Sequence, residues 1–501
     1  MNLKNSPLLL IIPLFFIAAA DIRISGSNHA EYWVFVDKEL DTSNYKEHLE
    51  DKLKLSVNYG DITLKGVLFL WSPSLSVQEK LNYLDYAAIY SKDAVNILYG
   101  TYYTTFGRGL ALNAFLDEDF RIDNSLYGVK VDFKYLGSQL TLLSGEPRCI
   151  FFEENKYKIK NEEHTSDQIR GINFNTKLIP KTTLGSRYVR INQTTDLTPK
   201  AFTELFGGDI DFTIGPFDAY FEYARQWGSD DVIGGRVRGD GILFTTSFAT
   251  PGLGISCQFM DYNDIGFGNP GYRYNEPPTP IKSGISVNRG LDEVGYGVSF
   301  IVSPLDFLTL ELDHNKISTH DETVNKFKEI ATISDNMDGV LEHVAKMTIY
   351  TTYDLEINGG VERVLKQGIE LPIEKKIETK PNIELTYNFG SFFIETGYEH
   401  NFISSDTSDY YDHAAFFSIG KPELFVFTLR YERRNRIPEW LVEKYGDETA
   451  WPLAELSLDL THRHNLRIRV GAEKGGLICS GGVCRFEEPL RGVKAVLTSI
   501  F

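Results

Sequence analysis

Charged side chains that alternate with apolar ones are the residues of this chain best placed to do chemistry. Between Phe425 and Glu432, charged or polar residues alternate with large apolar ones, and the same arrangement recurs in further segments of the C-terminal half. A strand points successive side chains to opposite faces, so each segment has one apolar and one charged face. The charged faces would supply rows of acids and bases that bind ions or pair with one another, from Glu311, Asp313, Arg430, Glu432, Glu455, Asp459, Arg467 and Arg469.

The segment Phe106–Val131 is a second concentration of charge, and it departs from alternation after Gly109. Its glycines permit a sharp bend. Groups of both signs can satisfy one another where water is scarce. Two interpretations are open: Gly107–Asn124 folds into a water-filled interior and narrows it, or the segment is an ordinary external loop. Its charged residues are Arg108, Asp117, Glu118, Asp119, Arg121 and Asp123.

Four cysteines supply the remaining reactive side chains. Cys479 and Cys484 are separated by Ser-Gly-Gly-Val, and the glycines allow a tight reversal that brings two sulfurs together. In an exported chain this predicts a disulfide that staples a hairpin tip, with a redox or docking role as the alternative. Cys149 and Cys257 are isolated in sequence, and their state stays open.

The elements that position these residues are predicted to be the strands of a membrane barrel. A charged side chain that faces lipid costs about 2–4 kcal/mol, so the charged faces must point inward and the apolar faces outward. Short turns such as Thr250–Gly252 also alternate with longer loops such as Asp37–Glu50 and Tyr262–Asp292, the asymmetry of membrane barrels. A soluble β-sandwich, with its apolar faces inside, is the competing interpretation.

The N-terminal residues favour the barrel. Lys4 precedes the apolar run Pro7–Ile17, and three alanines before Asp21 form a cleavage site. This is typical of a secretory signal peptide. The chain therefore divides into a signal peptide, residues 1–20, and a single barrel domain, residues 21–501, with no plug domain before the first strand.

The C-terminal residues agree with this. Val493, Ala495, Leu497 and Phe501 share one face of an extended strand that ends in an aromatic residue. We expect Phe501 to be the signal read by the barrel-assembly machinery. The predicted location is the outer membrane of a Gram-negative-type bacterium, in contact with lipid and lipopolysaccharide.

The fold is predicted to be an all-β transmembrane antiparallel up-and-down barrel, and counting the up and down strands along the chain gives about 24, within a range of about 20 to 26. The 33 Phe, 27 Tyr and 42 Gly suit strands with aromatic girdles and glycine-rich turns. After the signal no second run of about 18 apolar residues occurs, which argues against a helical membrane protein. The net charge of −18 argues against a nucleic-acid partner.

Three motifs resemble a known family of large outer-membrane barrels from Bacteroidota and related phyla, classed as a domain of unknown function. They are FGRGLALNAFLDEDFRIDNSLYGVKV at Phe106–Val131, NEPPTP at Asn275–Pro280, and GGLICSGGVCRFEEP at Gly475–Pro489 followed by the strand to Phe501. The resemblance runs loosely over the mature chain. It implies a barrel fold in the outer membrane and supplies no catalytic residues.

Other patterns point to no cofactor, metal or catalytic centre. Gly266–Gly271 matches G-x-G-x-x-G but lies in a Tyr- and Pro-rich loop without a strand-to-helix unit. The acidic tract Asp406–Asp412 lacks ordered ligand spacing and is interpreted as a solvated loop rather than a cation site. His462 and His464 have no nucleophile partner, so an enzyme is not expected.

The leading functional hypothesis is a channel or transporter with a polar, net acidic lumen, because a barrel this wide cannot be filled by its own wall side chains. The alternative is a structural or assembly barrel that anchors a surface lipoprotein or secretion partner. The sequence identifies neither the cargo nor the oligomeric state.

Overall fold

The structure is a computed structural model that describes most of the chain after the N-terminal segment. The described residues are 22–36, 45–72, 81–118, 122–148, 150–153, 156–159, 167–192, 202–230, 235–265, 274–275, 277–282, 287, 291–321, 323–352, 354–370, 373–438, 442, 448–474, 476–480, 483–487 and 490–501. The predicted signal peptide lies outside them.

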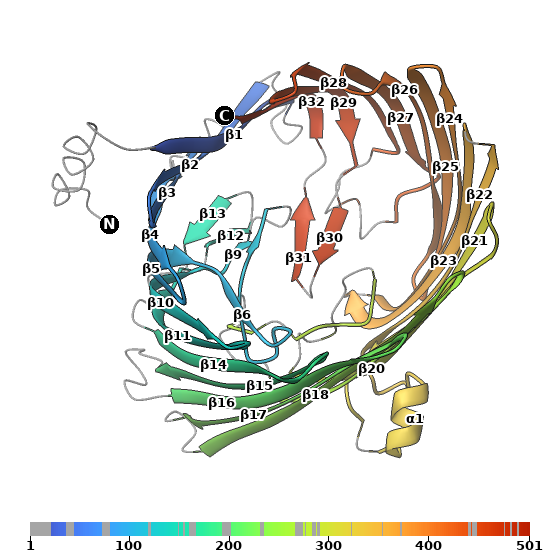
Figure 1. The fold of residues 1–501 in the computed structure, drawn as a ribbon. Helices are drawn as coiled ribbons and strands as arrows, with labels where there is room; N and C mark the ends of the chain where they lie inside the picture. Colours follow the sequence, from blue (N-terminus) through green and yellow to red (C-terminus); the bar gives the residue numbers. More distant parts are fainter. Residues whose placement is uncertain are drawn as a thin grey trace.

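The wall is one 24-stranded antiparallel sheet that closes on itself (Figure 1). Each strand pairs with the next wall strand along the chain, and the last pairs with the first. The fold predicted from the sequence is confirmed, as is the strand number. The first half of the wall consists of β1 (Arg23–Val36), β2 (Tyr45–Tyr59), β3 (Ile62–Ser72), β4 (Leu81–Lys92), β5 (Val95–Tyr102), β10 (Leu126–Tyr135), β11 (Ser138–Pro147), β14 (Gln168–Ile179), β15 (Thr182–Asn192), β16 (Phe202–Ile214), β17 (Phe217–Asp230) and β18 (Gly235–Thr250).

The second half continues in the same up-and-down order. It consists of β19 (Leu253–Asn263), β20 (Asp292–Leu305), β21 (Leu308–Ser318), β22 (Gly339–Thr352), β23 (Leu355–Glu370), β24 (Ile373–Phe389), β25 (Phe392–Ser405), β26 (Asp409–Lys421), β27 (Phe425–Arg434), β28 (Ala450–Thr461), β29 (His464–Glu473) and β32 (Leu490–Ile500).

Short elements in the longer connections lie apart from the wall. The small strands lie inside the ring in Figure 1, and the helix lies outside it. They are β6 (Thr104–Phe106), β7 (Leu112–Ala114), β8 (Leu116–Asp117), β9 (Ile122–Asp123), β12 (Ile150–Glu153), β13 (Lys156–Ile159), β30 (Gly476–Ser480), β31 (Val483–Glu487) and α1 (Lys326–Ala331). No helix among the described residues is long and apolar enough to cross a membrane.

The two ends of the described chain meet where the barrel closes. Ser27 of β1 pairs with Ile500 of β32, and Phe501 exchanges two backbone hydrogen bonds with Gly26, of 2.8 and 3.0 Å. The short turns, such as Ile214–Phe217 and Phe389–Phe392, lie at this same end. The long connections lie at the other end. The loop predicted at Asp37–Glu50 extends too far into the next strand, because β2 already begins at Tyr45.

Alternation fixes the two faces of the wall. The outward rows carry large apolar side chains that remain exposed, among them Phe402 at 52%, Leu429 at 48% and Val470 at 50%. The inward rows carry charged residues that line the lumen, among them Glu432, Glu455 and Arg469. Such an outer surface is stable only where lipid replaces water, which is the arrangement of a membrane barrel.

A second apolar cluster lies inside the barrel. It joins residues of the inward connections, such as Leu110 and Leu112, to inner-face residues of the wall, such as Ile191, Leu205 and Leu243. All five side chains are 1% exposed or less. The wall alone cannot fill a barrel of this width. Part of the interior is therefore a packed core made by loops.

Candidate functional site in the barrel lumen

The connection between β5 and β10 enters the lumen and packs there. It forms the hairpins β6–β7 and β8–β9, and β9 also pairs with β12 from the next long connection. Phe106, Leu110 and Leu112 are almost fully buried in the inner core. Burial of such side chains contributes roughly 1.5–3 kcal/mol each. Apolar residues, rather than the charges that first marked this segment, supply most of its packing.

The NEPPTP motif helps to hold this segment. Asn275 is fully buried, and its Nδ2 donates hydrogen bonds to the carbonyl oxygens of Leu110 (3.0 Å) and Ile265 (2.8 Å). Tyr262 of β19 donates from its hydroxyl to the carbonyl of Pro278 at 3.0 Å. A buried carbonyl left without a donor would cost about 1–3 kcal/mol, so these bonds stabilise the inward fold.

A buried ion network lies where the segment meets the wall. Arg187 of β15 donates to Glu222 of β17 at 2.6 Å and also pairs with Asp209 of β16. The backbone N–H of Arg108 donates to the same Glu222 carboxylate at 3.0 Å. Tyr220 donates its hydroxyl to Glu222 as well, at 2.6 Å. The charged wall groups thus anchor the segment at its sharpest bend.

Arg108 then points into a cavity of about 610 Å³. Its guanidinium lies 4.1 Å from the centre of the Tyr220 ring, and its Nη1 donates to Thr245 Oγ1 at 2.7 Å. Lys282 lines the same cavity and bridges Glu311 (2.5 Å) and Asp313 (2.6 Å). The structure therefore brings Arg108 and Asp313 together around one polar cavity beside the inward segment, with Glu311 joined to it through Lys282.

The acidic part of the segment has separate partners. Glu118 accepts hydrogen bonds from Lys52 (2.7 Å) and Lys54 (2.6 Å) of β2. Burial alone would raise the pKa of Glu118, but the two ammonium groups outweigh it and lower the pKa to about 2. Asp123 is buried, which raises its pKa, and it accepts a bond from the backbone N–H of Ser125 at 2.9 Å. Asp117 is half-buried in β8; Asp119 and Arg121 lie outside the described residues.

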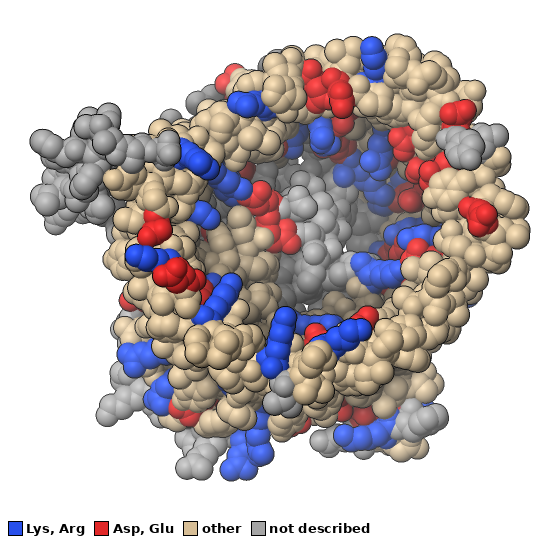
Figure 2. All heavy atoms as spheres, in the orientation of Figure 1, with Lys and Arg blue, Asp and Glu red and all other residues tan. Residues whose placement is uncertain are grey.

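The other half of the lumen, along β24 to β29, encloses an open cavity of about 690 Å³. Figure 2 shows basic and acidic side chains on the inner wall around the hollow. The cavity is lined by more carboxylates than cations. The carboxylates are Glu384, Glu395, Glu399, Glu432, Glu455 and Glu473, and the cations are Arg430, Arg469 and Lys474.

The arginines of this half are compensated by neighbouring carboxylates. Arg430 pairs with Glu432 at 2.6 Å. Glu455 accepts from Arg469 at 2.5 Å and lies 3.6 Å from Arg467. Asp459 accepts a hydrogen bond from Asn465 at 2.8 Å. The predicted lumen arginines of β27 to β29 thus each have a carboxylate nearby, whereas Asp459 has a neutral partner.

Three glutamates on the facing strands lack such compensation among the described residues. Glu384 of β24 and Glu395 and Glu399 of β25 make no ion pair with any described residue. Glu395 lies within hydrogen-bond reach of Glu384, so two carboxyl groups meet without a cation. Alternation places these three glutamates on the inward rows of β24 and β25. Their lack of partners could not be read from alternation, because it depends on which side chains oppose them across the lumen.

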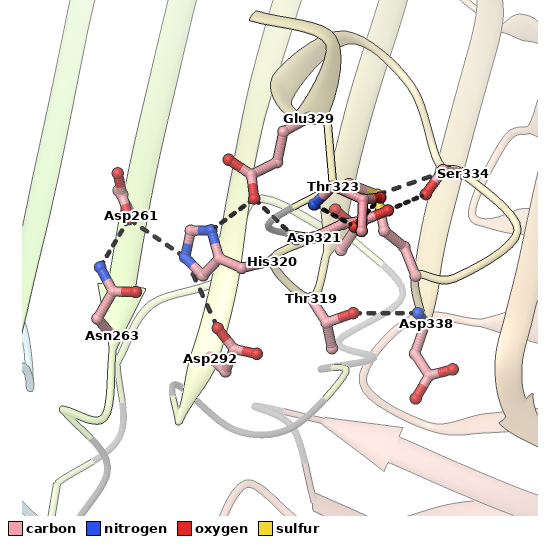
Figure 3. Close-up of polar contacts among 12 residues, drawn as sticks. Asp261, Asn263, Asp292, Thr319, His320, Asp321, Thr323, Glu329, Ser334 and Asp338 are labelled. Atoms are coloured by element: carbon pink, nitrogen blue, oxygen red, sulfur yellow. Dashed lines mark hydrogen bonds and ion pairs between the residues drawn. The ribbon is translucent and has the colours of Figure 1, made fainter. Parts of the chain in front are cut away.

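A further polar cluster lies outside the barrel wall, under α1 (Figure 3). His320 follows β21 and contacts Asp261 of β19 (3.3 Å) and Glu329 of α1 (3.0 Å). Burial would lower the pKa of His320, but hydrogen bonds to these two carboxylates raise it to about 9. Asp321 accepts bonds from Ser334 (2.7 Å) and the Thr323 backbone (2.9 Å). The charged imidazolium therefore fastens the connection 319–338 to the outer wall.

The remaining predicted site residues have defined backbone positions. Cys479 and Cys484 are opposite one another in the β30–β31 hairpin, whose side chains lie outside the described part of the structure. The disulfide stays a prediction. Cys257, in β19, has no disulfide partner among the described residues. Within those residues, no group of three or more His, Cys, Asp and Glu side chains is placed to hold a metal ion.

The fold and its lumen define a large β-barrel of the outer-membrane type. A family model described as "Family of unknown function (DUF6029)" matches residues 15–276. The chain belongs to this family, as its sequence motifs suggested.

Several solved structures are similar to this chain. The siderophore receptor PirA from Pseudomonas aeruginosa is 7% identical, with a TM-score of 0.47 over 96% of this chain and 80% of that one. The translocation pore of the P pilus usher PapC is 8% identical, with a TM-score of 0.46 over 95% and 98%. OccK8 (OprE) from P. aeruginosa is 13% identical, with a TM-score of 0.41 over 69% and 94%. Similarity at this level reaches no further than the general barrel architecture. No match to a curated protein sequence was found.

Proposed function

We propose that this protein is an outer-membrane channel or transporter whose net acidic lumen favours cations. The supporting observation is the set of three inward glutamates, Glu384, Glu395 and Glu399, that no described cation neutralises. The facing arginines are already paired with Glu432, Glu455 and Glu473 and contribute little net field. The path for solutes is the open half of the lumen along β24 to β29, because loops pack the other half.

The physical argument concerns confinement. A carboxylate in bulk water is screened within about 8–10 Å, but a ring of charge in a narrow aqueous path acts on every ion that passes it. Carboxylates without partners raise the local cation concentration and repel anions. Paired charges cancel over the same distance. The three glutamates are therefore assigned the selectivity.

Neutralisation of the three glutamates tests this. The triple variant Glu384→Gln, Glu395→Gln and Glu399→Gln should still conduct in planar bilayers, with its cation-to-anion permeability ratio reduced severalfold. A matched variant, Asp61→Asn, Asp306→Asn and Asp335→Asn, removes three exposed carboxylates from turns and an outer loop. Its ratio should equal that of the wild type. A permeability ratio equal to that of the wild type in both triple variants would reject the role of the glutamates.

The proposal includes export by the signal peptide at residues 1–20 and contact with outer-membrane lipid and lipopolysaccharide. The structural alternative, a barrel that anchors a surface lipoprotein, requires no ion path. Purified protein that inserts into bilayers without any conductance would favour that alternative.

A further inference from the structure

Two pairs of histidines face outward from the barrel at directly opposed strand positions. His314 of β21 opposes His343 of β22, and His400 of β25 opposes His413 of β26. The outward direction follows from alternation, because Glu395 and Glu399 of β25 line the lumen while Phe402, in the same row as His400, is 52% exposed. Neither pair belongs to the lumen site.

The second pair has a third donor atom. Tyr398 Oη lies 2.7 Å from His413 Nδ1 and 3.4 Å from His400 Nδ1, and the two Nδ1 atoms are 2.8 Å apart. We call Tyr398, His400 and His413 the His–His–Tyr cluster. Its three donor atoms converge on one point on the outer surface.

Hydrogen bonds account for this arrangement only if one group is shared between two partners. A neutral imidazole nitrogen either donates one hydrogen or accepts through one lone pair. The Tyr398 hydroxyl and the His400 ring both lie at short range to His413 Nδ1, so they share either its one hydrogen or its one lone pair. A single cation at the centre would instead take one lone pair from each of the three atoms.

The spacing is close to that around one transition-metal ion. Metal–nitrogen and metal–oxygen bonds of about 2.0–2.2 Å place neighbouring ligands of one ion about 2.9–3.4 Å apart. The cluster shows separations of 2.7, 2.8 and 3.4 Å, of which the two shorter ones lie slightly below this range. Tyr411 stacks on His400, with ring centres 5.2 Å apart, and contacts His413 edge-on at 4.9 Å, so neighbouring rings fix the imidazole planes.

We propose that the His–His–Tyr cluster binds one divalent transition-metal ion through His400 Nδ1, His413 Nδ1 and the Tyr398 oxygen. Imidazole ligands suit Cu²⁺ and Zn²⁺, and Cu²⁺ binds such a set most tightly. His400 and His413 lie on the outer wall among exposed aromatic residues and do not line the open cavity assigned to solutes, which Tyr398 borders. The cluster supplies a metal-binding function that does not depend on conduction.

The other histidine pair is a natural control. The His314 and His343 Nδ1 atoms are 3.0 Å apart, but Tyr296 Oη contacts His314 on its far nitrogen, Nε2, at 2.7 Å. Only two donor atoms converge there. We expect this pair to bind more weakly than the His–His–Tyr cluster.

The test is Cu²⁺ binding to tag-free, metal-stripped barrel in detergent, followed by calorimetry and electron paramagnetic resonance. Wild type should bind one tight equivalent with nitrogen hyperfine splitting, and Cu²⁺ should displace Zn²⁺ from the same site. His400→Gln and His413→Gln should lose the tight equivalent. Tyr398→Phe should weaken it about tenfold or more, and His343→Gln should retain it.

Heat-modifiable migration of each variant on gels shows that its barrel is folded. Three outcomes would each overturn the assignment. Folded wild type binds no tight Cu²⁺, folded His413→Gln keeps the tight equivalent, or His343→Gln loses it to the same extent.

Discussion

Gly107 lies at a position where a side chain meets two obstacles. Its φ is +63°, and a Cβ there would overlap Arg187 and Glu222 of the buried ion network. A left-handed conformation costs about 1–2 kcal/mol for a residue with a Cβ. The overlap adds the cost of moving a hydrogen-bonded ion pair. The bend at Gly107 therefore depends on both the missing side chain and the network beneath it.

We predict that Gly107→Ala lowers the free energy of unfolding more than Gly60→Ala. Gly60 has a similar φ of +54° but no atom within 4 Å of its would-be Cβ. The two variants share the backbone cost, so the difference measures the overlap, about 1–3 kcal/mol. Urea unfolding in detergent, followed by tryptophan fluorescence, gives both values. Equal losses of unfolding free energy in the two variants would show that Arg187 and Glu222 move aside without cost.

At the scale of the elements, alternation predicted the wall strands but not the core inside them. The charges of Gly107–Asn124 mark the segment in the sequence, but they do not decide whether it enters the lumen. Leu110 and Leu112 make the contacts that the sequence could not assign, because their partners come from strands up to hundreds of residues away. For the same reason, alternation did not predict that Glu384, Glu395 and Glu399 lack an ion-pair partner among the described residues.

Exchange of Gly107–Asn124 for a Gly/Ser linker of equal length should raise single-channel conductance severalfold. The segment occupies the lumen and carries no wall strand, so the barrel can close without it. The control exchanges residues 319–338, which lie outside the wall, and should leave conductance as in the wild type. If both exchanges give the wild-type value, the segment does not narrow the path.

The connection at α1 should loosen at high pH. The pKa of His320 is raised to about 9 in the folded protein. The stability that the charged imidazolium gives to this connection is therefore fully present below the ordinary pKa of 6.5 and is lost as pH rises through about 9. Trypsin should therefore cleave after the exposed Lys328 faster at pH 10 than at pH 7, relative to a reporter peptide. His320→Gln should be cleaved quickly at both. A wild-type rate that does not change with pH would contradict this role of His320.

On the scale of the whole molecule, the closure of the barrel joins its two ends. The apolar outer face, the strand number and the turn-to-loop asymmetry were all predictable, because lipid admits few solutions for a strand with one charged face. The division of the lumen into a packed half and an open half was not. It depends on how long connections fold back, which alternation does not encode.

Deletion of Phe501 should reduce the amount of assembled barrel far more than Asp409→Ala. Phe501 makes the two backbone hydrogen bonds to Gly26 at the seam, and we expect the assembly machinery to read its aromatic ring. Asp409 lies at the start of β26, beside an external loop. Heat-modifiable protein in outer-membrane fractions measures both. Equal amounts would argue against a special role for the terminus.

The reversal potential of wild-type protein in a planar bilayer under a KCl gradient tests the central claim most directly. A water-filled path lined by Glu384, Glu395 and Glu399, which no described cation neutralises, predicts open-channel current and a reversal potential displaced toward the equilibrium potential of K⁺. No current in protein shown to have inserted, or a reversal potential displaced toward that of Cl⁻, would contradict the account.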